Sequence, residues 1–360
     1  MLEKDFIPSS YTYDKEKGRI QYTAPSNIAL VKYWGKKSNQ IPANASVSLT
    51  LDECRTVTTV VYTKLAKDTT DFSFDLLFEG KPREDFKPKI ETFFRRIENY
   101  LPFLRKYHFS IDTSNSFPHS SGIASSASGM AALALCLMDI EKQLAPEMEM
   151  DYFYKKASFL ARLGSGSACR SIKGTIVQWG EHNEIKGSTN LYGIPYPYTV
   201  ADVFKSYQDT ILLVHKGQKS VSSTVGHDLM HGHPFAKNRF HQAHNNLIRL
   251  RDIFAEGNLD DFIEVVESEA LTLHAMMMTS IPYFILMKPN TLSIIEKIWG
   301  FRKETGNHLC FTLDAGANVH LLYPDNEKNI VNQFIKDELI AYCENGQYIC
   351  DRIGEGAKKL

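Results

Sequence analysis

Residues 117–138 read FPHSSGIASSASGMAALALCLM, a run of small residues that leads directly into an apolar one. The near-continuous apolar stretch from Met130 predicts a buried helix, because no face of it is polar. Its first turn is made of glycine and serine, and the unpaired N–H groups and dipole at such an end favour an anion such as phosphate. No Gly-Lys-Ser/Thr follows, so this is not a Walker loop. The alternative is that Ser125 or Ser126 only caps the helix.

A second stretch rich in small residues, RLGSGSACRS, occupies residues 162–171 and follows a predicted helix over 151–163. Ser165 and Ser167 alternate with glycines, which suits hydroxyl groups presented to a ligand from a turn. Arg170 adds a planar guanidinium that matches a carboxylate or a phosphate. A packed loop without a ligand is the alternative.

Two charged residues stand at unusual places in predicted strands. In TLDAGAN, residues 312–318, Asp314 ends an apolar strand just before a glycine turn, where it can act as a general base or cap the turn. In NIALVKYWGK, residues 27–36, Lys32 interrupts an apolar pattern. It either reaches the margin of the sheet or faces a buried anion.

The whole chain has 360 residues, 43% of them hydrophobic, and a formal net charge of -1. This length favours two domains, and we place their boundary near residue 200, giving domains 1–200 and 201–360. Near-neutral charge argues against nucleic-acid binding, so attraction to an anion must be local. The apolar run from Met130 is too short to span a membrane and the N-terminus has no signal-peptide pattern, so we expect a cytoplasmic protein. The six scattered cysteines are expected to be free thiols, and most of them buried.

Hydrophobic periodicity outlines further elements. It predicts strands over residues 19–35, 45–63 and 107–118, a strand starting at 208, and two strands within 308–324. It predicts helices over residues 87–104 and within 235–278. The histidines of residues 227–233 lack a second close Cys/His pair, so we expect no structural metal there.

Four segments occur in an order and at separations that resemble one known family. They are APSNIALVKYWGKK (24–37), FPHSSGIASSASG (117–129), RLGSGSACRS (162–171) and TLDAGAN (312–318). Together they are similar to the diphosphomevalonate decarboxylases of the GHMP kinase superfamily, over about residues 20–325. The combination of KYWGK with GSGSACRS is highly specific, whereas the serine-rich helix start alone indicates only the superfamily.

This resemblance implies an α+β, two-domain GHMP kinase fold. The N-terminal domain would resemble domain 2 of ribosomal protein S5 and carry the phosphate loop, and a ferredoxin-like C-terminal domain would deliver Asp314. The implied reaction uses ATP and Mg²⁺ to phosphorylate the 3-hydroxyl of mevalonate 5-diphosphate, which then loses phosphate and CO₂ to give isopentenyl diphosphate. A homodimer is also implied.

The resemblance assigns roles to individual residues. Asp314 would orient or deprotonate the hydroxyl, Lys32 would offset charge on the transferring phosphoryl group, and Arg170 would bind the substrate carboxylate. Ser165 and Ser167 would hold substrate oxygens. The substrate diphosphate would meet Tyr33, Lys36, Ser222 and one of Arg95 and Arg96. The nucleotide loop would comprise Ser120, Ser121, Gly122, Ala124, Ser125 and Ser126, with Ser126 also near Mg²⁺.

Some positions depart from the family pattern. Ala43 and Ala45 replace hydroxyl residues in a loop expected near the nucleotide, residues 119–121 are His-Ser-Ser in place of small apolar residues, and Ala317 replaces proline. The first two departures bear on nucleotide affinity and preference. A decarboxylase of mevalonate 5-phosphate, a 3-kinase and a non-catalytic binding protein are the alternatives. The joint presence of Asp314, Lys32 and Arg170 argues against the last two.

Overall fold

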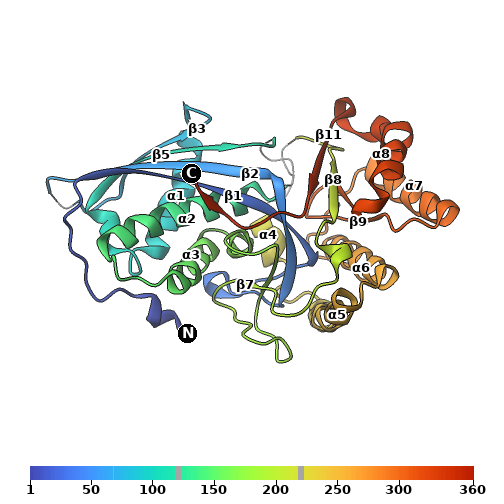
Figure 1. Ribbon diagram of the computed structural model, residues 1–360, viewed down its shortest axis with the longest axis horizontal. Helices are drawn as coiled ribbons and strands as arrows, with labels where there is room; N and C mark the ends of the chain where they lie inside the picture. The colour runs from blue at the N-terminus through green and yellow to red at the C-terminus, as the bar shows by residue number, and fades with distance from the viewer. Residues whose placement is uncertain (68, 119–122, 218–222) are drawn as a thin grey trace.

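The computed structural model describes residues 1–67, 69–118, 123–217 and 223–360, which form two units lying side by side (Figure 1). Within this described part, the first unit is built on an eight-stranded sheet of order β12-β1-β2-β5-β3-β4, to which β6 and β7 are added at β2. The second unit has a four-stranded antiparallel sheet of order β11-β8-β10-β9. The expected two-domain α+β architecture is therefore confirmed.

The bounds of the elements of the first unit are as follows. Its strands are β1 (Lys17–Val31), β2 (Ser46–Lys64), β3 (Ser73–Phe78), β4 (Lys81–Pro82), β5 (Tyr107–Asn115), β6 (Ile176–Trp179), β7 (Ile194–Pro195) and β12 (Lys358–Lys359). Its helices are α1 (Lys87–Ile97), α2 (Ser125–Leu144) and α3 (Met150–Gly164).

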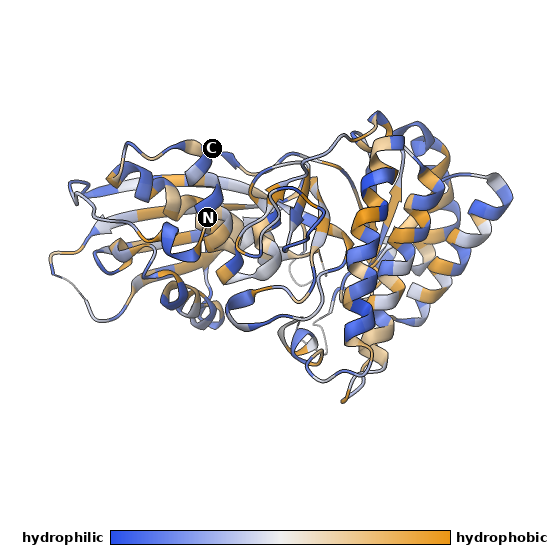
Figure 2. Cartoon of the chain, turned by 90° about the horizontal axis from the view of Figure 1, so that it is seen from below, coloured by the Kyte–Doolittle hydropathy of each residue, from blue (hydrophilic) through white to orange (hydrophobic). Residues whose placement is uncertain are grey.

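The elements of the second unit follow. Its strands are β8 (Gln208–Leu212), β9 (Cys310–Thr312), β10 (Val319–Tyr323) and β11 (Tyr348–Arg352). Its helices are α4 (Ser223–Asp228), α5 (Ala236–Glu256), α6 (Leu259–Met278), α7 (Pro289–Thr305) and α8 (Lys328–Phe334). Many turns of these helices show orange and blue side by side in Figure 2, as amphipathic helices that cover a sheet do.

The long antiparallel pair β1 and β2 links the two units. The outer half of β1 has partly exposed positions, whereas its inner half, from Thr23 to Val31, is buried on both faces. Its end packs in one apolar cluster with residues of the second unit, including Phe254 and Phe262. A strand buried in this way delivers the residue that follows it, Lys32, to the boundary between the units.

Helix α2 is the buried helix that its apolar sequence predicts: 15 of its 20 residues are buried, and most of these belong to the apolar core of the first unit. The residue before it, Ala124, has left-handed backbone angles and provides no side-chain cap. Ser125 and Ser126 are therefore the first helical residues, and neither of them is the N-cap. Their hydroxyls therefore do not cap α2.

Some predicted bounds were wrong. The expected strand 19–35 ends at Val31, and the expected helix 87–104 ends at Ile97, with a 3₁₀ turn following from Pro102. Proline lacks an N–H and restricts the residue before it, which ends a helix. The short strand β12 pairs with β1, so the end of the chain returns to the first sheet. The division at residue 200 stays a prediction.

Two further findings concern the cysteines and the helices. All six cysteines are free and five are buried, as expected, with only Cys350 exposed. Among the residues described, none of the helices combines the length and the apolar character needed to cross a lipid bilayer.

Candidate active site

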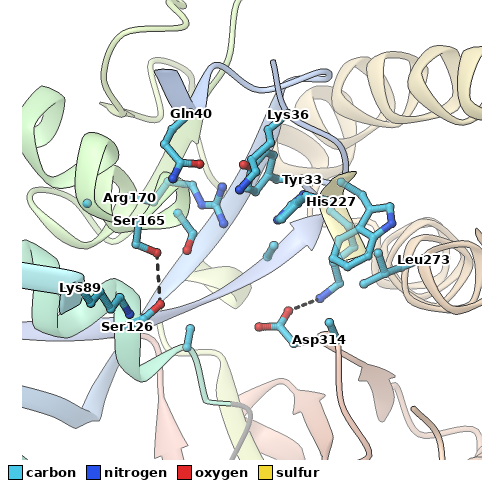
Figure 3. Close-up of a pocket in the computed structure, with 18 residues that line it drawn as sticks. Tyr33, Lys36, Gln40, Lys89, Ser126, Ser165, Arg170, His227, Leu273 and Asp314 are labelled. Atoms are coloured by element: carbon cyan, nitrogen blue, oxygen red, sulfur yellow. Dashed lines mark hydrogen bonds and ion pairs between the residues drawn. The ribbon is translucent and has the colours of Figure 1, made fainter. Parts of the chain in front are cut away.

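A cavity of about 200 Å³ lies where the two units meet (Figure 3). It is lined by the residues just after β1, the start of α2, the turn after α3, and residues of α1, α4, α6 and the β9–β10 turn. The predicted site residues that it brings together are Lys32, Tyr33, Lys36, Ala124, Ser126, Ser165, Ser167, Arg170 and Asp314. Four other predicted residues, Ser120, Ser121, Gly122 and Ser222, lie outside the described residues, as does His119.

Lys32 and Asp314 form an ion pair at the floor of the cavity, with 3.1 Å between Nζ and Oδ1. Lys32 is 2% exposed and Asp314 is 27% exposed, so the carboxylate keeps access to a ligand while the ammonium does not reach bulk water. Burial lowers the pKa of Lys32, and the neighbouring carboxylates of Asp314 and Glu269 oppose that shift. Lys32 therefore faces an anion that is partly exposed, and the Asp314 carboxylate points to Lys32 and the cavity.

Arg170 is buried with its guanidinium directed at the cavity (Figure 3). Its Nη1 donates to Ser46 Oγ (2.8 Å) and its Nε to Asn27 Oδ1 (3.3 Å), and these bonds fix its orientation. Desolvation lowers its pKa. No carboxylate of the described residues lies within salt-bridge distance of it. A buried cation without an anion is costly, so the site is built for an anionic ligand.

An aromatic wall closes one side of the cavity. The Tyr33 ring packs against His227 (4.3 Å between centroids) and Trp179 (4.8 Å), and His227 also packs against Trp34 (4.6 Å). His227 Nδ1 accepts from the Gly35 N–H at 3.0 Å, and burial lowers the pKa of His227 to about 3. The Tyr33 hydroxyl is buried and has no hydrogen-bond partner within the described part of the chain. An unsatisfied hydroxyl on a cavity wall is suited to an incoming oxygen.

The two serine-rich segments meet across the cavity. Ser126 Oγ, at the start of α2, lies 3.2 Å from Ser165 Oγ, in the turn after α3. Ser167 lines the same wall. Gly166 lies between Ser165 and Ser167 in the sequence, and a Cβ at this position would come within 2.9 Å of the Tyr33 hydroxyl. The close approach explains why this turn alternates glycine with serine.

A second cavity of about 160 Å³ adjoins the first. It lies among β2, β3, β5, α1 and α2, and its wall is mostly apolar, with Phe78 and Phe86 among its residues. Ser125 lines it, and both Lys89 and Ser126 line the two cavities. The mostly apolar cavity and the charged cavity therefore meet at Lys89 and Ser126.

Lys89 is a residue that sequence reasoning missed. It comes from α1, and no hydrogen bond or ion pair to another described residue is found for it. Although its side chain keeps contact with solvent, the concave wall around it lowers its pKa through desolvation. Its helical position gave no signal, because a lysine on the polar side of an amphipathic helix is usually a solvated surface charge. Gln40 and His227 were likewise missed.

The expected arginine of the diphosphate site is not found in the wall. Arg95 is exposed and pairs with Glu91, while Arg96 donates to the Leu163 carbonyl at 2.9 Å. Neither is among the described lining residues. Ala43 and Ala45 are also absent from the described walls of both cavities.

The charge of the main cavity is strongly one-sided. Its described lining contains the cations Lys32, Lys36, Lys89 and Arg170, against one carboxylate, Asp314. Partial burial lowers the pKa of Lys36, with Asp228 opposing that shift. Such a wall selects an anion with more than one charged group. Within the described ranges, no cluster of three or more His, Cys, Asp or Glu side chains could hold a metal.

The fold and this cavity define a two-domain α+β protein of the GHMP kinase type, as comparison with known proteins also shows. The model of the diphosphomevalonate decarboxylase-like N-terminal domain matches residues 24–190, and that of the mevalonate 5-diphosphate decarboxylase C-terminal domain matches residues 210–355. The chain belongs to the diphosphomevalonate decarboxylase family.

Individual relatives agree along most of their length. The diphosphomevalonate decarboxylase of Aspergillus fumigatus is 28% identical over 343 residues, covering 90% of this chain and 81% of its own. A solved structure described as MDDEF in complex with MVAPP, AMPPCP and magnesium has a TM-score of 0.81 at 26% identity, covering 96% and 99% of the two chains. The mevalonate diphosphate decarboxylase of Staphylococcus aureus has a TM-score of 0.79 at 27% identity, covering 96% and 98%.

Proposed function

We propose that the protein catalyses the ATP-dependent decarboxylation of mevalonate 5-diphosphate to isopentenyl diphosphate, releasing ADP, phosphate and CO₂. One observation carries the proposal: the described lining of the cavity gathers four cations around one carboxylate, Asp314, which an ammonium group holds in place. The substrate has an anion at each end and a hydroxyl between them. It therefore complements this wall, and family membership supports the same conclusion.

We assign the two ends of the substrate to opposite parts of the cavity. Arg170, a buried cation without a carboxylate partner among the described residues, binds the substrate carboxylate as a planar fork. Tyr33 and Lys36 face the diphosphate, and the buried Tyr33 hydroxyl, which no described residue bonds, is able to donate to one of its oxygens. Ser165 and Ser167 hold the remaining substrate oxygens from the turn after α3.

The reacting hydroxyl belongs at Asp314. Its carboxylate orients the tertiary 3-hydroxyl and accepts its proton while that oxygen is phosphorylated. Lys32, 3.1 Å away, keeps Asp314 in place and offsets negative charge near the transferring group. Loss of the new phosphate breaks the C3–O bond and leaves positive character at C3. The bond between the carboxylate carbon and C2 then breaks, and its electron pair forms the C2=C3 alkene as CO₂ is released. Arg170 holds that carboxylate in line until it leaves.

The nucleotide fits the second cavity and its junction with the first. The apolar wall suits a base, and the start of α2, which no side chain of a described residue caps, offers backbone N–H groups to phosphate. Ala124, Ser125 and Ser126 lie at this start, and Lys89 adds a positive charge. Mg²⁺ arriving with the nucleotide would neutralise phosphate charge, and Ser126 would be the hydroxyl that helps to hold it.

The test is to incubate the purified protein with ATP, Mg²⁺ and either mevalonate 5-diphosphate or mevalonate 5-phosphate, measuring ADP and CO₂ together. Equal ADP and CO₂ with the diphosphate alone is the expected result. The same result with the monophosphate would reassign the substrate. ADP without CO₂ would indicate a 3-kinase, and neither product would indicate a non-catalytic binding protein.

We further propose a cytoplasmic homodimer that does not engage nucleic acid. Resemblance to the family supports the dimer, and the near-neutral net charge of -1 supports the absence of nucleic-acid binding. Sedimentation equilibrium should give twice the chain mass of 40.9 kDa. A mass of one chain across micromolar concentrations would contradict the dimer.

A further inference from the structure

Lys32 is held in place by side chains and not by the sheet. It is the first residue after β1, so its peptide groups have left the strand ladder. Its N–H donates to Glu269 Oε2 at 2.8 Å, and its carbonyl accepts from Asn44 Nδ2 (2.9 Å) and Arg239 Nη2 (3.2 Å). Glu269 and Arg239 belong to the second unit, on α6 and α5. The second unit therefore fixes the backbone of a first-unit residue.

Glu269 is itself held firmly. It is fully buried and accepts two bonds from Arg239, at 2.9 and 2.5 Å, and one from Asn246 Nδ2 at 2.7 Å. With the Lys32 N–H, the carboxylate has four donors around its two oxygens. A buried carboxylate satisfied in this way has little freedom to move, so it is a rigid anchor for Lys32.

The same helix also holds Asp314. Five residues after Glu269, His274 lies buried with Nε2 at 3.1 Å from the Asp314 carbonyl oxygen. Because a carbonyl only accepts, Nε2 carries the proton. Leu273, beside it on α6, forms part of the cavity wall next to Asp314 (Figure 3).

We propose that α6 sets the separation of the Lys32 ammonium and the Asp314 carboxylate, with Glu269 and His274 as positioning residues. Each of these side chains bonds to a backbone group: Glu269 accepts from the Lys32 N–H, and His274 donates to the Asp314 carbonyl. The anchors stand about 7.5 Å apart along one helix, at about 1.5 Å per residue. Reacting groups misplaced by about 1 Å lose much of their rate, so this element has a direct effect on turnover. The inference rests on the function proposed above.

Two replacements of His274 test the contact. His274→Gln keeps an N–H donor at a similar reach, whereas His274→Leu fills the space without a donor. We expect kcat to fall by about 10- to 100-fold in His274→Leu with KM values within about threefold, and to recover most of the way in His274→Gln. A role in packing alone predicts the opposite order. Equal kcat in the wild type and both variants would overturn the inference.

Glu269 is tested against a matched buried ion pair. Lys156 and Glu141 pair inside the first unit with exposures of 0% and 1%, and neither lines the cavity. Glu269→Gln and Glu141→Gln each leave a buried cation unpaired, so both should lower Tm. Only Glu269→Gln should lower kcat at a temperature where both are folded. If Glu269→Gln and Glu141→Gln lose kcat equally, Glu269 only stabilises the fold and does not position Lys32.

A readout independent of activity separates this inference from the proposed function. Crystal structures of the wild type and His274→Leu should show the Nζ–Oδ1 distance of 3.1 Å lengthened in the variant. An unchanged distance would overturn the inference whatever the protein catalyses. A wild-type protein that releases no CO₂ would count against the function, while the two distances would still decide the role of α6.

Discussion

Asp314 is the one carboxylate among the described lining residues of the main cavity. Its partner Lys32 lies 282 positions earlier in the chain, yet the two side chains meet at 3.1 Å. All other charges on the described wall are positive. A neutral residue at position 314 therefore tests the acid–base step without removing any group that binds an anion.

Asp314→Asn should leave folding and ligand binding nearly unchanged and reduce turnover by about 10²- to 10⁴-fold, the usual contribution of a positioned general base. Single-turnover measurement of ADP and CO₂, with circular dichroism to check the fold, gives the comparison. Full activity in this variant would remove Asp314 from the mechanism.

Lys89 has no partner among the described residues and stands at the junction of the two cavities. Lys89→Met should raise KM for ATP by about tenfold while KM for the second substrate stays within about twofold, because a charged contact to phosphate is lost. Lys87→Met is the control, since Lys87 lies on the same helix and pairs with Glu84 at 3.0 Å. If both variants behave alike, Lys89 is an ordinary surface lysine.

At the scale of elements, periodicity predicted the long strands, the buried helix α2, and α5 with α6, because each repeats its pattern over many residues. Ser165, Ser167 and Arg170 line the main cavity, and their role in binding an anion, predicted from their residue types, stays a prediction. Contacts between segments that are distant in the sequence leave no such periodic pattern. The α6 anchor at His274 and the strand β12 depend on segments that meet only after folding, and a two-residue strand has no period.

Helix α4 is attached to the residues after β1 through His227, which packs between two aromatic rings and is neutral in the fold because burial lowers its pKa to about 3. The unfolded chain has an ordinary histidine pKa of about 6.5, so it binds the proton first as pH falls. Stability from this group is complete above pH 6.5 and is lost as pH falls towards 3. Between pH 7 and 5 the loss is about 2 kcal/mol.

Denaturant titrations of the wild type and His227→Gln at several pH values measure this contribution as a difference. The wild type should lose about 2 kcal/mol more than the variant between pH 7 and 5. Parallel pH dependences would show that His227 does not resist protonation in the folded state.

At the scale of the whole molecule, a second-unit carboxylate joins the two sheets. Asp351 on β11 accepts from the backbone N–H groups of Asp52, Glu53 and Cys54 on β2, at 2.9, 2.8 and 2.7 Å. This point lies well away in sequence from the predicted boundary near residue 200. The two units are therefore joined by hydrogen bonds between their sheets as well as by the chain that runs from one to the other.

Asp351→Ala leaves those three N–H groups without their partner and should destabilise the protein by about 3 kcal/mol, as measured by urea unfolding. Asp52→Ala, which removes the surface pair with Arg352 at 2.9 Å, should cost less than about 1 kcal/mol. Similar losses in the two variants would mean that Asp351 does not secure the join between the units.

The return of β12 to the first sheet has a mechanical consequence. The chain crosses between the units once before β8 and again after β11, and the second crossing lies tight against the first unit: the Gly354 N–H donates to the Thr50 carbonyl at 2.8 Å, and a Cβ on Gly354 would meet the Leu51 carbonyl oxygen at 2.5 Å. Two units joined by a single chain segment can twist and slide relative to each other. Units joined by two segments mainly rotate about the line that passes through both segments. Lys32 and Asp314 come from opposite units, so the second crossing restricts the directions in which the ammonium and the carboxylate could move apart.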